Sequence, residues 1–415
     1  MSSAAIVPVP SRFPEAAALD LPALRDVPLR LGYIDGIRGL AALYVVMTHH
    51  LQNMGGPPTP ELRAAFGWLG HGHYAVDVFI VLSGFCLALP YVRDPSYLAS
   101  RAGVAAYFGR RARRILPPYF AALGLSLAVV WLVPGTASAT VAGTVAHLFL
   151  VHNLHPIWVH EINPPMWSVA VEWQIYFLLP LLIMPVRRRW GLGAAVAAAW
   201  VVGMVPHFAL PPGRNLDWTF PWYVGLFALG AAAAEVGHQQ GGKWASLRAR
   251  VPWGFLATGL AAVVLAATAM DARWCLKTYV LDAVIGSAFA ALLVHLSAQR
   301  SEGHWLGALL SCRPLVALGG FSYSLYLTHL PVAWATAHAA HLAWPGEYPS
   351  RGAEFAARLV AGTACALLVG YGFYRAAERP FLRPAQNRSD LLSAKVDHAG
   401  GRHPVEVLSG PTRVV

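Results

Sequence analysis

The stretch that decides the fold is YIDGIRGLAALYVVMTHH, from Tyr33 to His50. Most of its residues are apolar enough to enter a lipid bilayer, yet it also carries Asp35, Arg38 and His49. An ionisable side chain at the centre of a membrane helix costs about 2.5–3.5 kcal/mol on insertion scales, and such residues usually pair or serve a function. The stretch therefore predicts a membrane helix with a specific use for its polar side chains.

The spacing of Arg38 and His49 places them on one face of this helix. They are eleven residues apart, which is about three turns and a rise of roughly 16 Å. Each alone is compatible with a structural role, either a snorkelling arginine or a histidine bonded to a neighbouring helix. Together they favour a function, in which the guanidinium holds an anion and the imidazole acts as a general base. Asp35 either caps the helix or orients the guanidinium.

The composition of the whole chain indicates a membrane protein. Of its 415 residues, 56% are hydrophobic and 12% are charged, whereas soluble domains average about 25% charged residues. We predict an all-α, polytopic integral membrane protein of about ten transmembrane helices. The predicted spans are 36–54, 74–92, 116–134, 167–186, 190–208, 217–237, 253–270, 278–297, 315–342 (tilted, or broken near Pro331) and 356–375.

The distribution of basic residues predicts the orientation. If the N-terminus is cytoplasmic, 24 of the 31 Lys and Arg lie in cytoplasmic segments and six in the opposite loops. This asymmetry follows the positive-inside rule and places both termini in the cytoplasm. We expect a cytoplasmic tail at 1–32, a membrane domain at 33–383 and a flexible cytoplasmic tail at 384–415. The net charge of +11 is then a membrane signal, and no nucleic-acid partner is expected.

No metal is expected either. The four cysteines are scattered without a C-x-x-C pair, and the histidines of segment 135–166 do not follow a metal-ligand spacing. We interpret the cysteines as small buried hydrophobic residues and the histidines as interfacial.

A basic cluster follows the second predicted span. Its arginines Arg110, Arg111 and Arg114 lie on the same predicted side as Arg38. They are explained either by contact with anionic lipid headgroups or as a cradle for a phosphate-bearing cytoplasmic donor.

Further polar residues interrupt three other spans. Asp77 and the pair Ser83-Gly84 lie in the second span, where helix packing is the default explanation. Glu172 lies in the fourth span and forms either a structural hydrogen bond or a bond to a histidine or a substrate hydroxyl. The ninth span carries Ser322, Tyr323, Tyr326 and His329. Of these, Ser322, Tyr326 and His329 share a helix face and form a polar stripe that points into the bundle.

Together these segments resemble the membrane-bound acyltransferase family 3. The likeness is carried, in order, by YIDGIRGLAALYVVMTH, VDVFIVLSGF, RRARRILPPY, WSVAVEWQIYFLLPLL and LGGFSYSLYLTHLPV, and ends with YRAAERPF. It covers residues 33 to 383. The resemblance implies an enzyme that moves an acyl group, most commonly acetyl, from cytoplasmic acyl-CoA to a hydroxyl of a carbohydrate or natural product.

The resemblance also implies roles for individual residues. Matched by motif position, they are His49, Glu172 and Asp35 as catalytic residues, Arg38, Arg110, Arg111 and Arg114 as acyl-CoA-binding residues, and Ser322, Tyr323, His329 and Asp77 as substrate-binding residues. His50 stands beside His49, but the spacing to Arg38 favours His49 as the base. The expected setting is the bacterial cytoplasmic membrane, with membrane lipid and a carbohydrate or lipid-linked glycan acceptor as partners.

Alternatives of other classes remain open at this level. Buried Arg, His and Glu are also typical of a transporter or flippase, although no inverted repeat is visible. A scaffold for envelope assembly is a third hypothesis, which the polar stripe of the ninth span disfavours. The acceptor is equally open, since an envelope polysaccharide and a secondary metabolite such as a macrolide both present hydroxyl groups.

Overall fold

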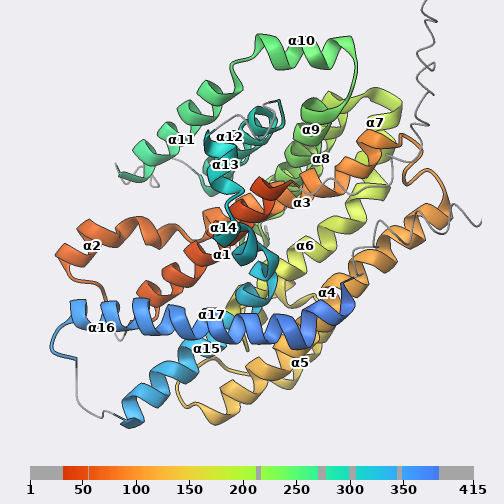
Figure 1. Cartoon of the computed structure of the whole chain (residues 1–415). Helices are drawn as coiled ribbons and strands as arrows, with labels where there is room; N and C mark the ends of the chain where they lie inside the picture. Colours follow the sequence, from red (N-terminus) through yellow and green to blue (C-terminus); the bar gives the residue numbers. More distant parts are fainter. Residues whose placement is uncertain are drawn as a thin grey trace, which may run out of the picture.

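All regular secondary structure in the described part of the chain is helical, and no strand occurs there (Figure 1). The structure is a computed structural model and describes residues 31–54, 56–211, 216–269, 277–298, 305–343 and 348–382. The two predicted tails lie outside these residues, apart from Leu31 and Gly32. The α-helices are α1 (Gly32–Gln52), α2 (Pro60–Phe66), α3 (His73–Arg93), α4 (Arg101–Leu132), α5 (Val141–Leu148), α6 (Trp167–Leu178), α7 (Met184–Trp190), α8 (Leu192–Ala209), α9 (Tyr223–His238), α10 (Gly242–Arg250), α11 (Trp253–Ala269), α12 (Thr278–Ala298), α13 (Trp305–Leu310), α14 (Arg313–Gly320), α15 (Ser322–Ala343), α16 (Arg351–Ala357) and α17 (Thr363–Phe373).

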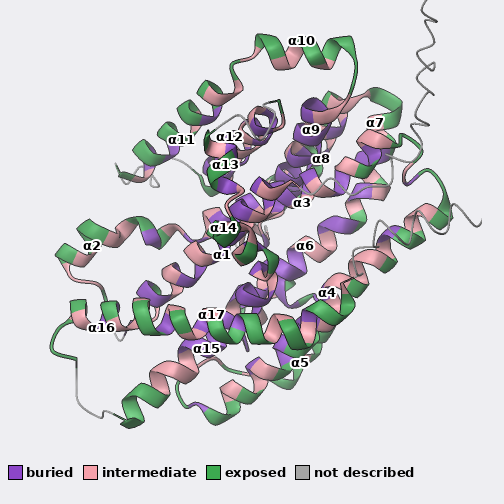
Figure 2. Ribbon diagram, viewed as in Figure 1, coloured by how far each residue is buried: buried purple, intermediate pink, exposed green. Residues whose placement is uncertain are grey.

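The core of the fold is the packing of α3 against α9. Both helices are largely buried, whereas α8 and α11 present many exposed apolar side chains (Figure 2). The two backbones meet at Gly84 and Gly230. A Cβ at Gly84 would overlap the carbonyl oxygen of Phe227, and a Cβ at Gly230 would overlap that of Val81. Small residues at such crossings let membrane helices approach closely, so these glycines hold the two helices together.

Within the described residues, seven helical segments are long and apolar enough to span a membrane, and α10 and α11, which meet at a bend of 55°, make an eighth if they count as one span. The protein is therefore an integral membrane protein. Two of the ten predicted spans, now α1 and α15, are not among these eight. They are 21 and 22 residues long, but their polar side chains lower their hydropathy. The count of ten, like the orientation of the termini, stays a prediction.

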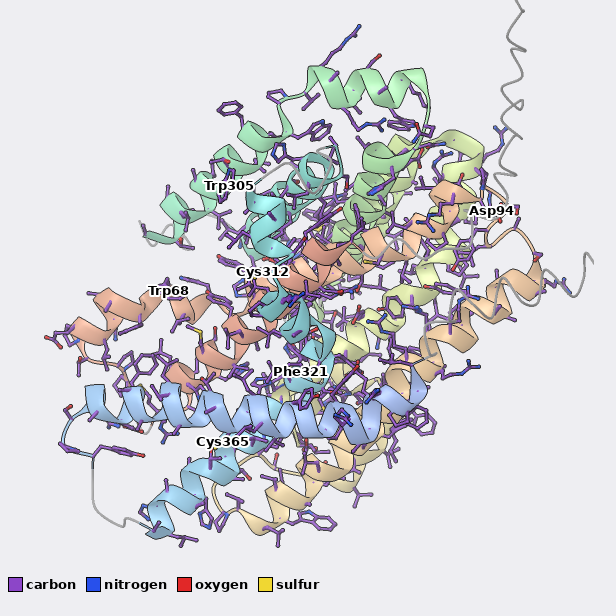
Figure 3. The ribbon with its side chains drawn as sticks, viewed as in Figure 1. Trp68, Asp94, Trp305, Cys312, Phe321 and Cys365 are labelled. Atoms are coloured by element: carbon purple, nitrogen blue, oxygen red, sulfur yellow. The ribbon has the colours of Figure 1, made fainter. Side chains whose placement is uncertain are left out.

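The ninth predicted span is broken, but not where its proline stands. Phe321 separates α14 from α15 and is labelled in Figure 3. The break follows the pair Gly319-Gly320, which favours a helix end. Pro331 lies inside α15, so the predicted break at Pro331 is wrong.

Asn163 explains how α15 continues past Pro331. Proline has no backbone N–H, so the carbonyl of the residue four positions earlier loses its helical partner. That carbonyl belongs to Leu327, and it accepts a hydrogen bond of 2.9 Å from Nδ2 of Asn163. The same amide group donates to Oγ of Ser126 in α4 at 3.1 Å. One side chain thus satisfies the freed backbone group and joins α15 to α4.

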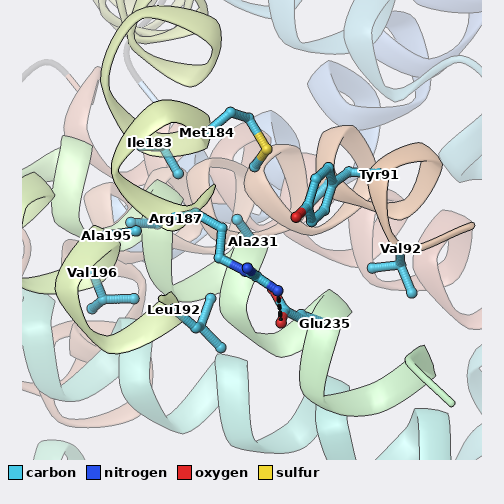
Figure 4. Close-up of a pocket in the computed structure, with 12 residues that line it drawn as sticks. Tyr91, Val92, Ile183, Met184, Arg187, Leu192, Ala195, Val196, Ala231 and Glu235 are labelled. Carbon is cyan, nitrogen blue, oxygen red and sulfur yellow. Dashed lines mark hydrogen bonds and ion pairs between the residues drawn. The ribbon is translucent and has the colours of Figure 1, made fainter. Parts of the chain in front are cut away.

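Basic side chains gather at one end of the bundle. Arg187 of α7 forms two hydrogen bonds, of 2.7 and 2.6 Å, with the buried carboxylate of Glu235 in α9 (Figure 4). Arg188 donates to the backbone carbonyls of Tyr97 and Leu98, between α3 and α4. These bonds bring together three connections that the sequence predicts on one side of the membrane.

Replacing Gly84 by alanine tests the α3–α9 crossing. Gly84→Ala would force the two backbones apart. It should lower the free energy of unfolding by about 1–3 kcal/mol, the usual cost of overpacking a core. The matched control is Gly124→Ala in α4, where a Cβ meets no atom within 4 Å. Thermal unfolding of the detergent-solubilised protein, followed by gel filtration, measures the difference. Equal melting temperatures for the two variants would contradict the assigned contact.

Candidate functional site

A cavity of about 400 Å³ opens between α1, α3, α4, α6 and α15. The sequence predicted eleven site residues, and seven of them line this one cavity although they come from four separate segments. They are Asp35, Arg38, Arg111, Arg114, Glu172, Ser322 and Tyr323. Their convergence is a property of the fold, because no two of the segments are close in sequence.

Arg38 lies in the wall of the cavity and is held from two sides. Its Nη2 is 3.3 Å from Sγ of Cys86 in α3, and its Nη1 is 3.7 Å from Oδ1 of Asp35. The N-cap of α1 is Leu31, so Asp35 does not cap the helix but lies beside the guanidinium. Gly36 faces α13 so closely that a Cβ would overlap the carbonyl oxygen of Leu310. This contact fixes the turn of α1 that presents Arg38.

The arginines of α4 divide between two environments. Arg111 and Arg114 line the cavity together with Arg38, so three guanidinium groups face the same space. Arg110 is instead bonded to the hydroxyl of Tyr97 at 3.1 Å and lies over its ring. It is absent from the lining of the cavity, and its predicted part in donor binding stays a prediction. Arg113 is exposed.

Glu172 presents its carboxylate at the cavity and is held by hydroxyl groups. Ser83 of α3 donates to Oε1 of Glu172, and Tyr176, one turn further along α6, donates to the same oxygen. Both alternatives raised for Glu172 are therefore compatible with its place. It bonds a neighbouring helix, and it also borders the cavity.

Ser322 and Tyr323 begin α15 at the same cavity. The hydroxyl of Ser322 donates to the carbonyl of Gly319 at 2.9 Å, and that of Tyr323 donates to the carbonyl of Ile115 at 3.2 Å. Their side chains thus fix the start of α15 against α4. They share the cavity with the arginines and lie two turns from His329 in the sequence of α15.

His49 and His329 form a pair at the contact between α1 and α15. Nδ1 of His49 is 3.1 Å from Nε2 of His329, and the ring centroids are 4.9 Å apart. Nδ1 of His49 is also 2.9 Å from the carbonyl oxygen of Val45, while Nδ1 of His329 is 2.7 Å from that of Tyr326. The predicted base and a predicted substrate-binding residue are thus direct neighbours.

These contacts assign the tautomer of each neutral ring. A carbonyl oxygen only accepts hydrogen bonds, so Nδ1 carries the hydrogen in both histidines. Nε2 of His329 then accepts from Nδ1–H of His49, which it shares with Val45. Nε2 of His49 keeps its lone pair. A histidine held in one tautomer by its Nδ1–H is the arrangement of a general base.

Tyr326 connects the histidine pair to the arginine-lined cavity. Its ring borders the cavity and lies 5.8 Å, between centroids, from the ring of His329. Its hydroxyl is 2.7 Å from Oγ of Ser168 and donates to the carbonyl of Pro165. The pair therefore adjoins the inner wall of the cavity, three turns along α1 from Arg38.

Asp77 lies apart from this site. It is fully buried and faces Asp282 of α12 and Tyr223 of α9. Asp282 accepts a hydrogen bond of 2.8 Å from Nε1 of Trp222. Asp77 is therefore packed between helices, which was the default explanation for it, and it does not line the cavity. Its predicted role in substrate binding stays a prediction.

Sequence reasoning missed two groups of residues near the site. Cys86 was treated only as a small hydrophobic residue, yet it contacts Arg38. The second group is Arg351, Glu354 and Arg358. The two arginines were counted only as loop charges, and Glu354 was not considered. They form a cluster of ion pairs at the far end of α1. Their spacing of three and four residues, which predicts pairing on a helix, was the available signal.

Comparison with known proteins gives the family. The model of the acyltransferase domain matches residues 31–375. The chain is 28% identical over 326 residues to the acyltransferase MdmB of Streptomyces mycarofaciens, covering 73% of this chain and 79% of that protein. It is 28% identical to the putative peptidoglycan O-acetyltransferase YrhL of Bacillus subtilis, over 72% of this chain and 48% of that protein.

A third relative is the putative membrane-bound transacylase BcsY of Komagataeibacter xylinus, which is 24% identical over 72% of each chain. The match to YrhL spans only about half the length of YrhL. No solved structure matches the chain. With the family model matching most of the membrane part, the chain belongs to the membrane-bound acyltransferase family 3 and is an acyltransferase.

Proposed function

We propose that the protein transfers an acyl group, acetyl in the first instance, from acyl-CoA to a hydroxyl of a cell-envelope or secreted carbohydrate. The observation that carries the proposal is the convergence of Arg38, Arg111 and Arg114 on one cavity whose inner wall adjoins the His49–His329 pair. Arg38, a proposed phosphate ligand, and His49, the proposed base, thus lie toward opposite ends of α1.

The cavity fits the donor by its charge. Arginine binds phosphate through bidentate, charge-assisted hydrogen bonds, and three guanidinium groups exceed what the two carboxylates of the lining, Asp35 and Glu172, neutralise. CoA carries several phosphates, which supplies the missing negative charge. The rise of roughly 16 Å between Arg38 and His49 along α1 is comparable to the length of a pantetheine arm.

The reaction needs one proton acceptor. A thioester supplies the activated acyl group, and Nε2 of His49 removes the proton from the acceptor hydroxyl. The hydroxyl oxygen bonds to the acyl carbon while the carbon–sulfur bond breaks, and the proton leaves with the thiol, so His49 returns to its neutral form. His329 keeps His49 in the required tautomer and is a positioning residue. We assign Glu172 to the orientation of groups within the cavity rather than to proton transfer.

The carbohydrate acceptor is the part of the proposal that rests on relatives. YrhL is named as a putative peptidoglycan O-acetyltransferase, and OatA of Staphylococcus aureus, 23% identical over 43% of this chain, as an O-acetyltransferase. A secondary metabolite is the alternative acceptor. Radiolabelled acetyl-CoA given to membranes that contain the protein, followed by mass spectrometry of the labelled product, identifies the acceptor class.

Arg114→Gln tests donor binding. A hydrogen bond to a charged group contributes about 1.5–3 kcal/mol, so its loss should weaken the binding of CoA by roughly 10- to 100-fold. Arg113→Gln is the matched control, because Arg113 is exposed next to it on α4. Isothermal titration of CoA into each purified variant gives the dissociation constants. If both variants bind CoA as the parent protein does, the arginines serve lipid contact instead.

His49→Ala and two variants of His329 test the base. His49→Ala should lower the transfer rate by about 10²–10⁴-fold and leave CoA binding unchanged. His329→Ala should lower it by about 10- to 100-fold, and His329→Gln should retain more activity because its amide oxygen accepts from Nδ1–H of His49. Transfer of radiolabelled acetyl groups in reconstituted membranes is the measurement. Full activity of His49→Ala would rule out this assignment.

A further inference from the structure

A second cavity, of about 1280 Å³, lies at the opposite end of α1 from Arg38. Among the described residues it is formed by the end of α1, the second half of α15, residues 348–350, α16, the π-helical turn η9 (Arg358–Gly362) and the start of α17. Its polar lining includes His50, Thr336, Tyr348, Arg351, Glu354 and Arg358, and also His341 and Ser350. None of these residues belongs to the arginine-lined cavity or to the histidine pair.

His50 brings an unused imidazole to this cavity. The residue is 3% exposed, and its Nε2 has no hydrogen-bond partner among the described residues. Its ring lies against Gly362, where a Cβ would come within 2.6 Å of Cε1. A buried polar atom without a partner costs about 1–3 kcal/mol. A ligand in this cavity would supply the missing hydrogen bond to His50.

Glu354 places a fixed carboxylate in the same wall. Its Oε2 accepts from Nη1 of Arg351 at 2.9 Å, and its Oε1 accepts from Nε of Arg358 at 3.0 Å. A carboxylate has about four lone-pair sites, and each guanidinium has five donors. A hydroxyl group both donates and accepts hydrogen bonds, so it can pair with a carboxylate and with a guanidinium. The ring of Tyr348, 44% exposed, adds an aromatic surface at the rim.

One face of α15 connects the two cavities through the histidine pair. Tyr326 lines the arginine-lined cavity, His329 contacts His49, and Ala333 and Thr336 line the second cavity. Steps of three and four residues keep these side chains on one face of the helix. On α1, His50 directly follows His49. The proposed base thus lies between the two cavities.

We propose that the second cavity holds the acceptor, and that the acceptor is a polyhydroxylated chain of more than one sugar. This inference rests on the proposed function, because it gives the acyl group its destination. Glu354 and its two arginines bind the sugar hydroxyls, and His50 bonds a further hydroxyl. The volume exceeds the 300–1,000 Å³ typical of small-ligand pockets, which favours an oligosaccharide segment over a single sugar.

Glu354→Gln tests the site without knowledge of the acceptor. In membranes that contain the natural acceptors, acetyl transfer should fall about tenfold or more, the effect of losing one good charged hydrogen bond. CoA affinity should stay within twofold of the parent value. Glu61→Gln, an exposed acid on α2, is the matched control and should leave both values unchanged. Transfer at the parent rate by Glu354→Gln would overturn the proposal.

Two native cysteines separate failure of this proposal from failure of the donor site. Cys365, labelled in Figure 3, lines the second cavity, and Cys86 lines the first. Saturating acetyl-CoA, whose sulfur is blocked as a thioester and does not consume the reagent, should protect Cys86 from a bulky maleimide, and the reagent should then attach to Cys365 and abolish transfer. Cys365→Ala, treated in the same way, should lose no activity relative to its untreated form. This arm remains informative if Glu354→Gln fails to fold.

Each outcome decides between the proposals. If the labelled protein still transfers acetyl groups, the second cavity is not the acceptor site. If labelling of Cys365 abolishes CoA binding, this cavity belongs to the donor and the inference is wrong. If acetyl-CoA does not protect Cys86, the proposed donor site fails instead, whatever happens at Cys365. If the labelled product is not a carbohydrate, the assigned acceptor class is wrong.

Discussion

The contact between His49 and His329 is the interaction on which the rest of the site depends. It joins α1 to α15, the two predicted spans that fall outside the apolar candidates for crossing the membrane. Polar side chains that leave water must find partners within the bundle, and each ring provides one for the other. The same polar side chains that make these helices poor membrane spans by composition form the pair to which we assign proton transfer.

The surrounding helices keep this polar pair in place by close backbone contact. Gly36 brings α1 against α13, and Gly84 and Gly230 bring α3 against α9. The cavity between α1 and α3 therefore has rigid walls, and Arg38 enters it from a turn of α1 that cannot shift without a backbone clash. Preorganised charges of this kind do not have to be rearranged when a charged ligand arrives.

Much of the site could be predicted from the sequence, because its residues lie in contiguous motifs with helical spacing. The eleven-residue interval from Arg38 to His49 predicted one helix with two functional ends, and the structure has that helix. Spacing within one segment could not reveal contacts between segments. Arg110 bonds Tyr97 rather than the cavity, Asp77 faces Asp282, and His329 contacts His49 rather than Ser322.

The second cavity was missed for the same reason. Its charged wall comes from α16 and the turn η9 that follows it. The arginines of these segments were informative only for topology when they were counted as loop charges. The break at Phe321 was misplaced because a proline in a helix suggests a kink, and the partner that compensates for Pro331 lies far away in the chain. Long-range compensation of this kind leaves no local pattern.

The bond between Asn163 and the carbonyl of Leu327 has a consequence for the rotational setting of α15. A helix in an apolar bundle can turn about its own axis at low cost if its surface is uniform. α15 cannot, because rotation would break this bond and strand a backbone oxygen and an amide in a setting without water. The rotation of α15 about its own axis is therefore fixed, and so is the direction in which His329 faces α1. The backbone carbonyl that Pro331 leaves without a helical partner is thus the point at which Asn163 fixes α15 to α4.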